Sequence, residues 1–199
     1  MKIWVICSGE APVSRESRYD AAGYAAYRKA LLEGEPPAEG VKAARGEGFL
    51  LYVSPHAAAQ RSAALLYPEL EAVTEPRLAE LAPPRLRGSR PLWLWRLLTR
   101  PTDEDRAGAE ALISELDERE KDCILVSHPR MIPLLLDRMR VHGHCVNRGE
   151  FGAIKPMERI LVTRRDMHCG GCAHNCFLNN PGCGIGRDKA QRAGIPFEK

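Results

Sequence analysis

The sequence predicts a three-layer α/β fold, in which helices cover both faces of a mostly parallel sheet. Three short, apolar runs are typical of strands in such a sheet, because strands that are buried on both faces need no polar alternation. These runs lie at residues 3–7, 49–53 and 123–126. Each is followed by a small polar turn and then by a helical pattern. This alternation of strand and helix indicates parallel neighbours.

The remaining elements follow from turn residues and helix-start signals. We expect helices over residues 19–33, 55–67, 92–98, 103–120 and 130–139. Ser54 is a candidate N-cap for the second of these, and Thr102 begins an acidic cap for the fourth. Further strands are expected at residues 72–74, 151–154 and 158–163, the last two paired across Lys155-Pro156.

Composition divides the chain of 199 residues at about position 163. Residues 1–163 hold equal numbers of basic and acidic side chains, and so the formal charge of +3 lies in residues 164–199. This tail has few large apolar residues and concentrates Gly, Asn, Cys and His. We therefore expect an α/β domain over 1–163 and a small Cys-rich tail over 164–199.

Several classes of protein are disfavoured. No apolar run approaches the roughly 20 residues of a membrane-spanning helix, and the N-terminus lacks a secretory apolar segment. The expectation is therefore a cytoplasmic protein without a membrane partner. The small net charge of +3 also disfavours nucleic acid, which usually requires a basic face.

Polar motifs follow the three strands, and an acidic motif lies between the second and third. They read Cys7-Ser8-Gly9-Glu10, Ser54-Pro55-His56, Leu78-Ala79-Glu80 and Ser127-His128-Pro129. Parallel sheets bind ligands at the carboxyl ends of their strands, where the next helix begins and favours anions. The sequence therefore predicts a pocket around His128.

In their order and spacing these motifs resemble the histidine phosphatase (phosphoglycerate mutase-like) superfamily. The resemblance implies a mechanism in which a His from an Arg-His-Gly motif attacks phosphorus, while two Arg and a second His stabilise the phosphoryl oxygens. By this matching, Ser8 stands at the nucleophile, and Cys7 and Ala58 stand at the two arginines. His128 and Glu80 remain as the second histidine and the acid.

Two hypotheses follow from this resemblance. In the first, the protein is a pseudoenzyme with residual roles for His128 and Glu80, and it binds a phosphorylated or other anionic small molecule. In the second, it is a working phosphomonoesterase or mutase with rearranged groups, in which Arg61 and either Arg15 or Arg18 supply the positive charge. Ser8 with His128 as its base is a separate candidate for the nucleophile. The candidate ligand-binding residues are Ser8, Gly9, Arg15, Arg18 and Arg61.

The tail carries a separate chemical signal. Four cysteines, Cys169, Cys172, Cys176 and Cys183, follow the spacing C-x2-C-x3-C-x6-C and favour a structural zinc site. A [4Fe–4S] cluster is the alternative, because it also takes four thiolates. In a third functional hypothesis the tail is the active part, as a metal or redox sensor or as a module that docks a protein partner or a second copy of the chain.

Overall fold

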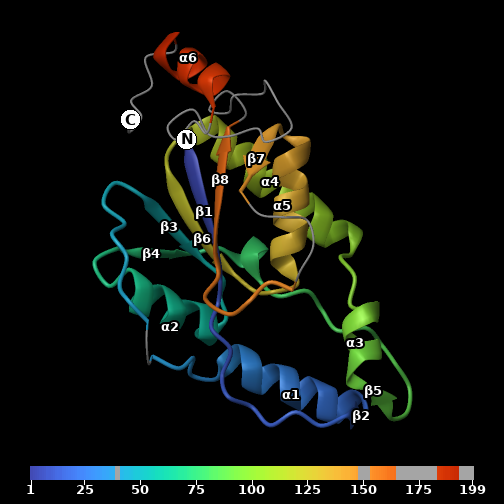
Figure 1. The fold of residues 1–199 in the computed structure, drawn as a ribbon. Helices are drawn as coiled ribbons and strands as arrows, with labels where there is room; N and C mark the ends of the chain where they lie inside the picture. The colour runs from blue at the N-terminus through green and yellow to red at the C-terminus, as the bar shows by residue number, and fades with distance from the viewer. Residues whose placement is uncertain (39–40, 148–152, 165–182, 193–199) are drawn as a thin grey trace.

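The computed structural model describes residues 1–38, 41–147, 153–164 and 183–192. Within them a six-stranded sheet has the order β4-β3-β6-β1-β8-β7 (Figure 1). Its strands are β1 (Lys2–Cys7), β3 (Leu50–Val53), β4 (Ala72–Thr74), β6 (Cys123–Ser127), β7 (His144–Val146) and β8 (Arg159–Arg164). Neighbours among β1, β3, β4 and β6 pair in parallel, whereas β8 is antiparallel to β1 and β7. The predicted α/β class with a mostly parallel sheet is confirmed.

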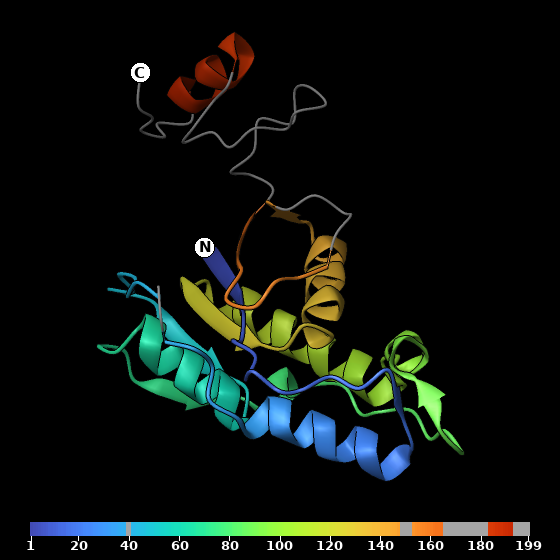
Figure 2. The same ribbon diagram turned by 60° about the horizontal axis from the view of Figure 1, so that its bottom comes forward.

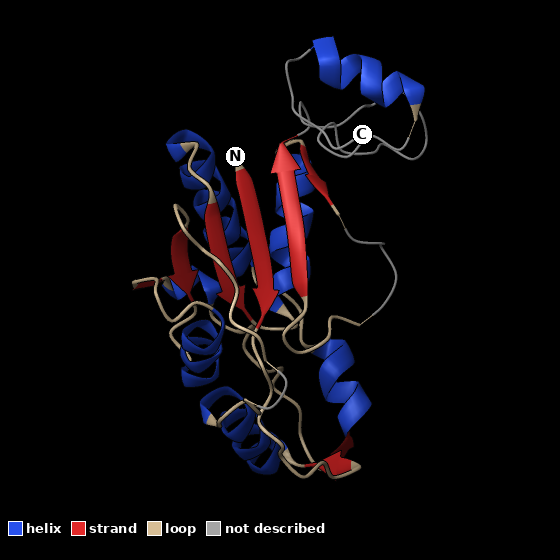
Figure 3. Ribbon diagram, turned by 60° about the vertical axis from the view of Figure 1, so that its left-hand side comes forward, coloured by secondary structure: helices blue, strands red, loops and turns tan. Residues whose placement is uncertain are grey.

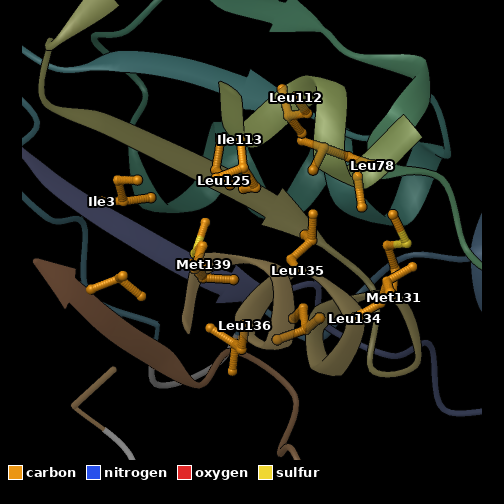
Figure 4. Close-up of a cluster of buried hydrophobic side chains, with 14 of the residues drawn as sticks. Ile3, Leu78, Leu112, Ile113, Leu125, Met131, Leu134, Leu135, Leu136 and Met139 are labelled. Atoms are coloured by element: carbon orange, nitrogen blue, oxygen red, sulfur yellow. The ribbon is translucent and has the colours of Figure 1, made fainter. Parts of the chain in front are cut away.

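Helices pack on both faces of this sheet. The described helices are α1 (Ala21–Glu33), α2 (Ala57–Leu66), α3 (Leu92–Leu98), α4 (Asp103–Arg119), α5 (Met131–Val141) and α6 (Gly184–Arg192), with a 3-10 turn η1 (Pro76–Leu78). On one face Leu112 of α4 and Leu135 of α5 pack against Ile3 and Leu125 (Figure 4). On the other face Ala63 of α2 packs against β1, β3 and β6. Among the described residues, no helix is both long enough and apolar enough to cross a membrane.

A third apolar cluster joins α1 to α3 away from the sheet. It contains Tyr24 and Tyr27 of α1, Trp95 of α3 and Tyr19. Tyr19 belongs to β2 (Arg18–Tyr19), which pairs with β5 (Arg90–Pro91) in a separate two-stranded sheet. In Figures 1 and 2 this unit lies beyond the carboxyl ends of the parallel strands. It therefore supplies a wall to the region in which parallel sheets bind ligands.

The register of the sheet brings three strand ends together. Cys7 at the end of β1 pairs with Ser127 at the end of β6, and Val53 at the end of β3 pairs with Val126. The ladder continues for one more residue on each side, because Ser8 N–H donates to the Ser127 carbonyl at 2.7 Å and Ser54 N–H donates to the Val126 carbonyl at 3.0 Å. Residues that are far apart in sequence therefore meet at one point.

Two helix starts were predicted, with different outcomes. The Thr102 hydroxyl caps α4 and forms a reciprocal capping box with Asp105, as expected. By contrast, α2 begins after His56, which makes no capping bond with its side chain. The expectation that Ser54 caps α2 is wrong, because His56 is the N-cap, and the Ser54 hydroxyl bonds His128 and accepts from His56 N–H, ahead of the helix.

The last strands also differ from the expectation. The strand expected at 158–163 is β8, but it pairs with β1 and β7. Ala153 and Ile154 are not in a strand, and residues 151–152 lie outside the described part. The partner is β7, a short strand of mixed polarity that lacks the apolar run on which the prediction depended.

Candidate functional site

The centre of the candidate site is His128, which stands between two serine hydroxyls. Ser8 Oγ lies 3.0 Å from His128 Nδ1, and Ser54 Oγ lies 2.9 Å from His128 Nε2. The ring is held at the carboxyl end of β6 and is only 1% exposed. One serine follows β1 and the other follows β3, so the three parallel strands build this group together.

This environment keeps His128 uncharged. A neutral imidazole has one donor and one acceptor nitrogen, so one of the two serines donates to the ring and the other accepts from it. Burial, followed by the nearby His56 and Arg28, lowers the pKa of His128 to about 3. At neutral pH the ring therefore supplies hydrogen bonds rather than positive charge.

A second histidine lies against the first. The His56 and His128 rings have centroids 5.0 Å apart and meet edge to face. Burial, and then the charge of Arg28, lowers the pKa of His56 as well. Two uncharged imidazoles therefore share the end of the sheet, and Arg28 favours the neutral state of both.

A cavity of about 550 Å³ opens onto Ser8 and His128. Its charged lining consists of five cations and two carboxylates: Arg15, Arg28, Arg96, Arg130, Lys155, Glu10 and Glu80. Burial raises the pKa of Glu80, which favours its neutral form. Glu10 is paired with Arg15 at 2.9 Å. The excess of positive charge suits an anionic ligand.

The arginines of the cavity are held in place by backbone carbonyls and a phenol. Arg28 of α1 donates to the Leu81 carbonyl at 2.5 Å, next to Glu80. Arg130 donates to the Arg96 carbonyl, and Arg96 donates to the Tyr27 hydroxyl at 3.3 Å. Each guanidinium has five N–H donors, so further donors remain for a phosphate or carboxylate.

The predicted ligand-binding arginines have three different positions. Arg15 lines the cavity. Arg18 lines a separate hollow and donates to the Ser89 carbonyl at 2.8 Å. Arg61 donates to the Glu33 carbonyl at 2.6 Å and lies 4.0 Å from Glu35, so it does not line the cavity.

The remaining predicted residues lie at the end of β1 and on α2. Gly9 N–H donates to Ser62 Oγ at 2.9 Å, and a Cβ at Gly9 would lie 2.4 Å from the Pro36 Cβ, so a close approach requires glycine here. Cys7 is fully buried, and burial raises the pKa of its thiol far above the usual range. Ala58 is buried and carries no charge to replace an arginine.

Sequence reasoning missed Arg28, Arg130 and the role of Ser54. Arg130 follows His128 by two residues, so its position just after the strand end was an available signal. Arg28 is a half-buried residue of α1 with no local motif around it, and only the packing of α1 across the strand ends brings it to the cavity (Figure 2).

The predicted metal site falls mostly outside the described residues. Cys169, Cys172 and Cys176 are not described, whereas Cys183 is a half-buried thiol whose Sγ accepts from Gly186 N–H at 3.4 Å. In the described part of the chain, no three potential ligands are grouped to hold a metal ion. Zinc, with the cluster as its alternative, stays a prediction that elemental analysis of the purified protein tests.

In comparisons with known proteins, only solved structures are similar to this chain. No protein-family model matches the chain, and no curated protein matches it. One solved structure is that of an Escherichia coli K-12 protein proposed to be an alpha-ribazole-5′-P phosphatase, with 22% identity, a TM-score of 0.45, and coverage of 70% of this chain and 79% of that chain. Another is the ecdysone phosphate phosphatase of Bombix mori in complex with tungstate, with 14% identity, a TM-score of 0.38, and coverage of 79% and 82%.

Proposed function

We propose that this protein binds a phosphorylated or otherwise anionic small molecule in the cavity and catalyses little or no phosphoryl transfer. The observation that carries the proposal is the cavity in which Arg28 and Arg130 face Ser8 and His128. A serine stands where the resemblance places the nucleophilic histidine, and the one deeply buried histidine that faces it among the described residues is uncharged.

The binding half of the proposal depends on the cations of the cavity. Arg28 and Arg130 face the same space as Ser8 and His128, and neither has a salt bridge within the described residues. Guanidinium groups bind phosphate and carboxylate through pairs of parallel hydrogen bonds. Burial raises the pKa of Glu80 and so favours its neutral form, which adds no repulsive charge to the same wall.

The proposal of little or no phosphoryl transfer depends on two absences at the described strand ends, a free nucleophilic histidine and the arginines beside it. Both nitrogens of His128 are engaged by serine hydroxyls, so neither is free to attack phosphorus. Cys7 and Ala58 provide no positive charge for the phosphoryl oxygens. Loss of a nucleophile lowers turnover in other enzymes by a factor on the order of 10⁶.

The test measures binding and turnover on the same sample of the full chain. Calorimetry with inorganic phosphate is expected to show binding that Arg28→Met weakens by about tenfold or more, because a charged hydrogen bond contributes about 1.5–3 kcal/mol. Arg61→Met is the matched control, since Arg61 lies outside the cavity. Absence of phosphate binding, or equal loss in both variants, contradicts the binding half.

Turnover of p-nitrophenyl phosphate tests the catalytic half. We expect no rate above that of a Ser8→Ala variant. A rate that both His128→Ala and Ser8→Ala abolish, in variants that keep the folded circular dichroism spectrum, would overturn the proposal.

The second candidate is a phosphomonoesterase with Ser8 as nucleophile, and the Ser8–His128 hydrogen bond favours it. Ser8 Oγ would bond to phosphorus while its proton moves to His128 Nδ1. The ester P–O bond would break, and the leaving oxygen would take the proton of neutral Glu80. Water would then hydrolyse the phosphoserine. A mass gain of one phosphoryl group on the Ser8 peptide after quenching identifies this reaction.

A further inference from the structure

The helix α3 is apolar on two opposite faces, of which one is buried and the other is exposed. Trp95 is buried, stacks on Tyr24 with ring centroids 4.5 Å apart, and donates its Nε1–H to the Tyr19 carbonyl at 3.1 Å. Trp93 and Leu97 are four residues apart, so they lie together on the opposite face. They are 63% and 59% exposed. A helix at the surface of a soluble protein ordinarily has polar residues there.

The sequence before, within and after α3 is rich in arginine. Between Glu80 and Asp103 the chain carries five arginines and no acidic residue. The five are Arg85, Arg87, Arg90, Arg96 and Arg100, and all of them are exposed. Within the described residues none of the five forms a salt bridge. Arg96 lines the cavity, and the charge of the other four is available to an external partner.

The arginine segment leads directly into α3, and Leu86 within it packs against the cluster that contains Trp95. Arg90 donates from Nε to the Arg87 carbonyl at 3.0 Å, and Arg90 pairs with Tyr19 across the β2–β5 ladder. Arg18, which is also exposed, lies on the neighbouring strand and pairs with Pro91. We call the side chains of Trp93, Leu97 and Leu98, together with Arg85, Arg87, Arg90 and Arg100, the α3 patch.

The α3 patch belongs to a part of the molecule that lies apart from the central sheet. Figures 1, 2 and 3 agree in placing α3, β2 and β5 at the periphery, beyond the strand ends. A projecting apolar tip with basic flanks suits insertion into a surface, whereas stable protein partners usually meet broad and complementary faces. A second copy that docked through the same patch would bring arginine against arginine.

We propose that the α3 patch docks the protein on an anionic lipid surface. Trp93 and Leu97 enter the interface between headgroups and acyl chains, where tryptophan is favoured, and the arginines contact headgroup phosphates. This mode requires an apolar contact and a basic contact together, and the patch offers both. It differs from the sequence expectation of no membrane partner, which considered spanning segments and did not consider an interfacial one.

The test is co-sedimentation of the full chain with vesicles. One set contains phosphatidylcholine alone, and the other contains an equimolar mixture with phosphatidylserine. We expect binding to the mixed vesicles, weakened by added salt and at least tenfold lower in Trp93→Ser/Leu97→Ser and in Arg85→Gln/Arg87→Gln/Arg100→Gln. Val141→Ser and Arg45→Gln are matched controls, because each alters an exposed residue outside the patch, and both should bind as the wild type does.

Fluorescence gives a second readout that does not depend on loss of binding. Mixed vesicles should shift the tryptophan emission of the wild type to the blue, and Trp93→Phe should bind without this shift. Absence of binding to mixed vesicles at low salt overturns the proposal, as does equal binding to phosphatidylcholine alone.

A third comparison distinguishes binding to a lipid surface from binding to any polyanion. The protein could bind duplex DNA through the arginines alone, with no effect of the Trp93 and Leu97 substitutions, and fail to bind vesicles. That outcome would replace the lipid proposal with a nucleic-acid one. Arg96 is unchanged in every variant, so calorimetry with phosphate on the same proteins reports the cavity separately. Failure of docking is therefore distinguishable from failure of the proposed function.

Discussion

Ser8 Oγ and His128 Nδ1 lie 3.0 Å apart although 120 residues separate them in the chain. The pair exists because β1 and β6 are parallel neighbours that end at the same edge of the sheet. The bond limits the chemistry of the site. A serine that is hydrogen-bonded to an uncharged histidine can contact a ligand or act as a weak nucleophile. A charged histidine would instead stabilise the negative charge of a phosphoryl group.

Acid is expected to destabilise the protein through His128. The pKa of this ring falls from 6.5 to about 3 on folding, so between these values the unfolded chain binds a proton that the folded chain does not. Stability is then lost as the pH falls, by up to about 1.4 kcal/mol for each unit. Urea unfolding across this window measures the slope, and His128→Asn should flatten it. Equal slopes in both proteins would contradict this assignment.

His142 should act with the opposite sign. Its Nε2 lies 2.7 Å from Glu110 and its Nδ1 lies 3.0 Å from Asp117, and the bond to Glu110 is the largest cause of its raised pKa. His144 and Arg138 also face this group, through Asp117 and Glu110 respectively. The stability from His142 is full below the usual pKa of histidine and is lost as the pH rises through its raised folded value.

His142→Gln provides the measurement for this second histidine. The difference in unfolding free energy between wild type and variant should be largest in mild acid and should shrink toward alkaline pH. A difference that is constant with pH would mean that hydrogen bonding, rather than charge, holds this corner of α4, α5 and β7.

Arg77 is expected to be important for stability because it is the main hydrogen-bond partner of the buried Glu75 carboxylate. Glu75 is 8% exposed and accepts from Arg77 Nε at 2.8 Å and from Arg77 Nη2 at 2.6 Å. Arg77→Met would leave this carboxylate without its main partner and should cost about 1–3 kcal/mol. The double variant Glu75→Gln/Arg77→Met should recover part of the loss. Arg119→Met, which alters a half-exposed side chain, should cost less in the same denaturant titration.

Anion binding should weaken as the pH rises through the raised pKa of Glu80. Burial favours the neutral acid, and its ionisation would place a negative charge in the cavity. Sulfate is the suitable probe, because its own charge is constant over the range. Calorimetry should show a pH dependence of sulfate affinity that Glu80→Gln removes. An affinity that rises with pH would exclude this role for Glu80.

Local patterns predicted most of the sheet because each central strand is itself an apolar run. The strand expected at 3–7 is β1, extended by one residue, and the one at 123–126 is β6, also extended by one. The helix at 92–98 and the Thr102 cap were predicted correctly, since both depend on residues that are neighbours in sequence.

Long-range competition explains the parts that were missed. Ser54 carries the residue type of an N-cap, but His128 lies within reach across the sheet and takes its hydroxyl. Arg61 was proposed for the pocket from its spacing after Ser54, whereas the α2 surface turns it toward the end of α1. Arg28 reaches the cavity only through the packing of α1, which no local spacing encodes.

The position of β1 has a consequence for synthesis of the protein. Its two partners, β6 and β8, begin at Cys123 and Arg159. β1 leaves the ribosome before the other strands of its sheet, and it must therefore wait for synthesis to reach Cys123 before either of its edges can be paired. At about 5–20 residues per second, that interval lasts several seconds or longer. During it the apolar segment Ile3-Trp4-Val5-Ile6 is a natural target for chaperones and for strand exchange between nascent chains.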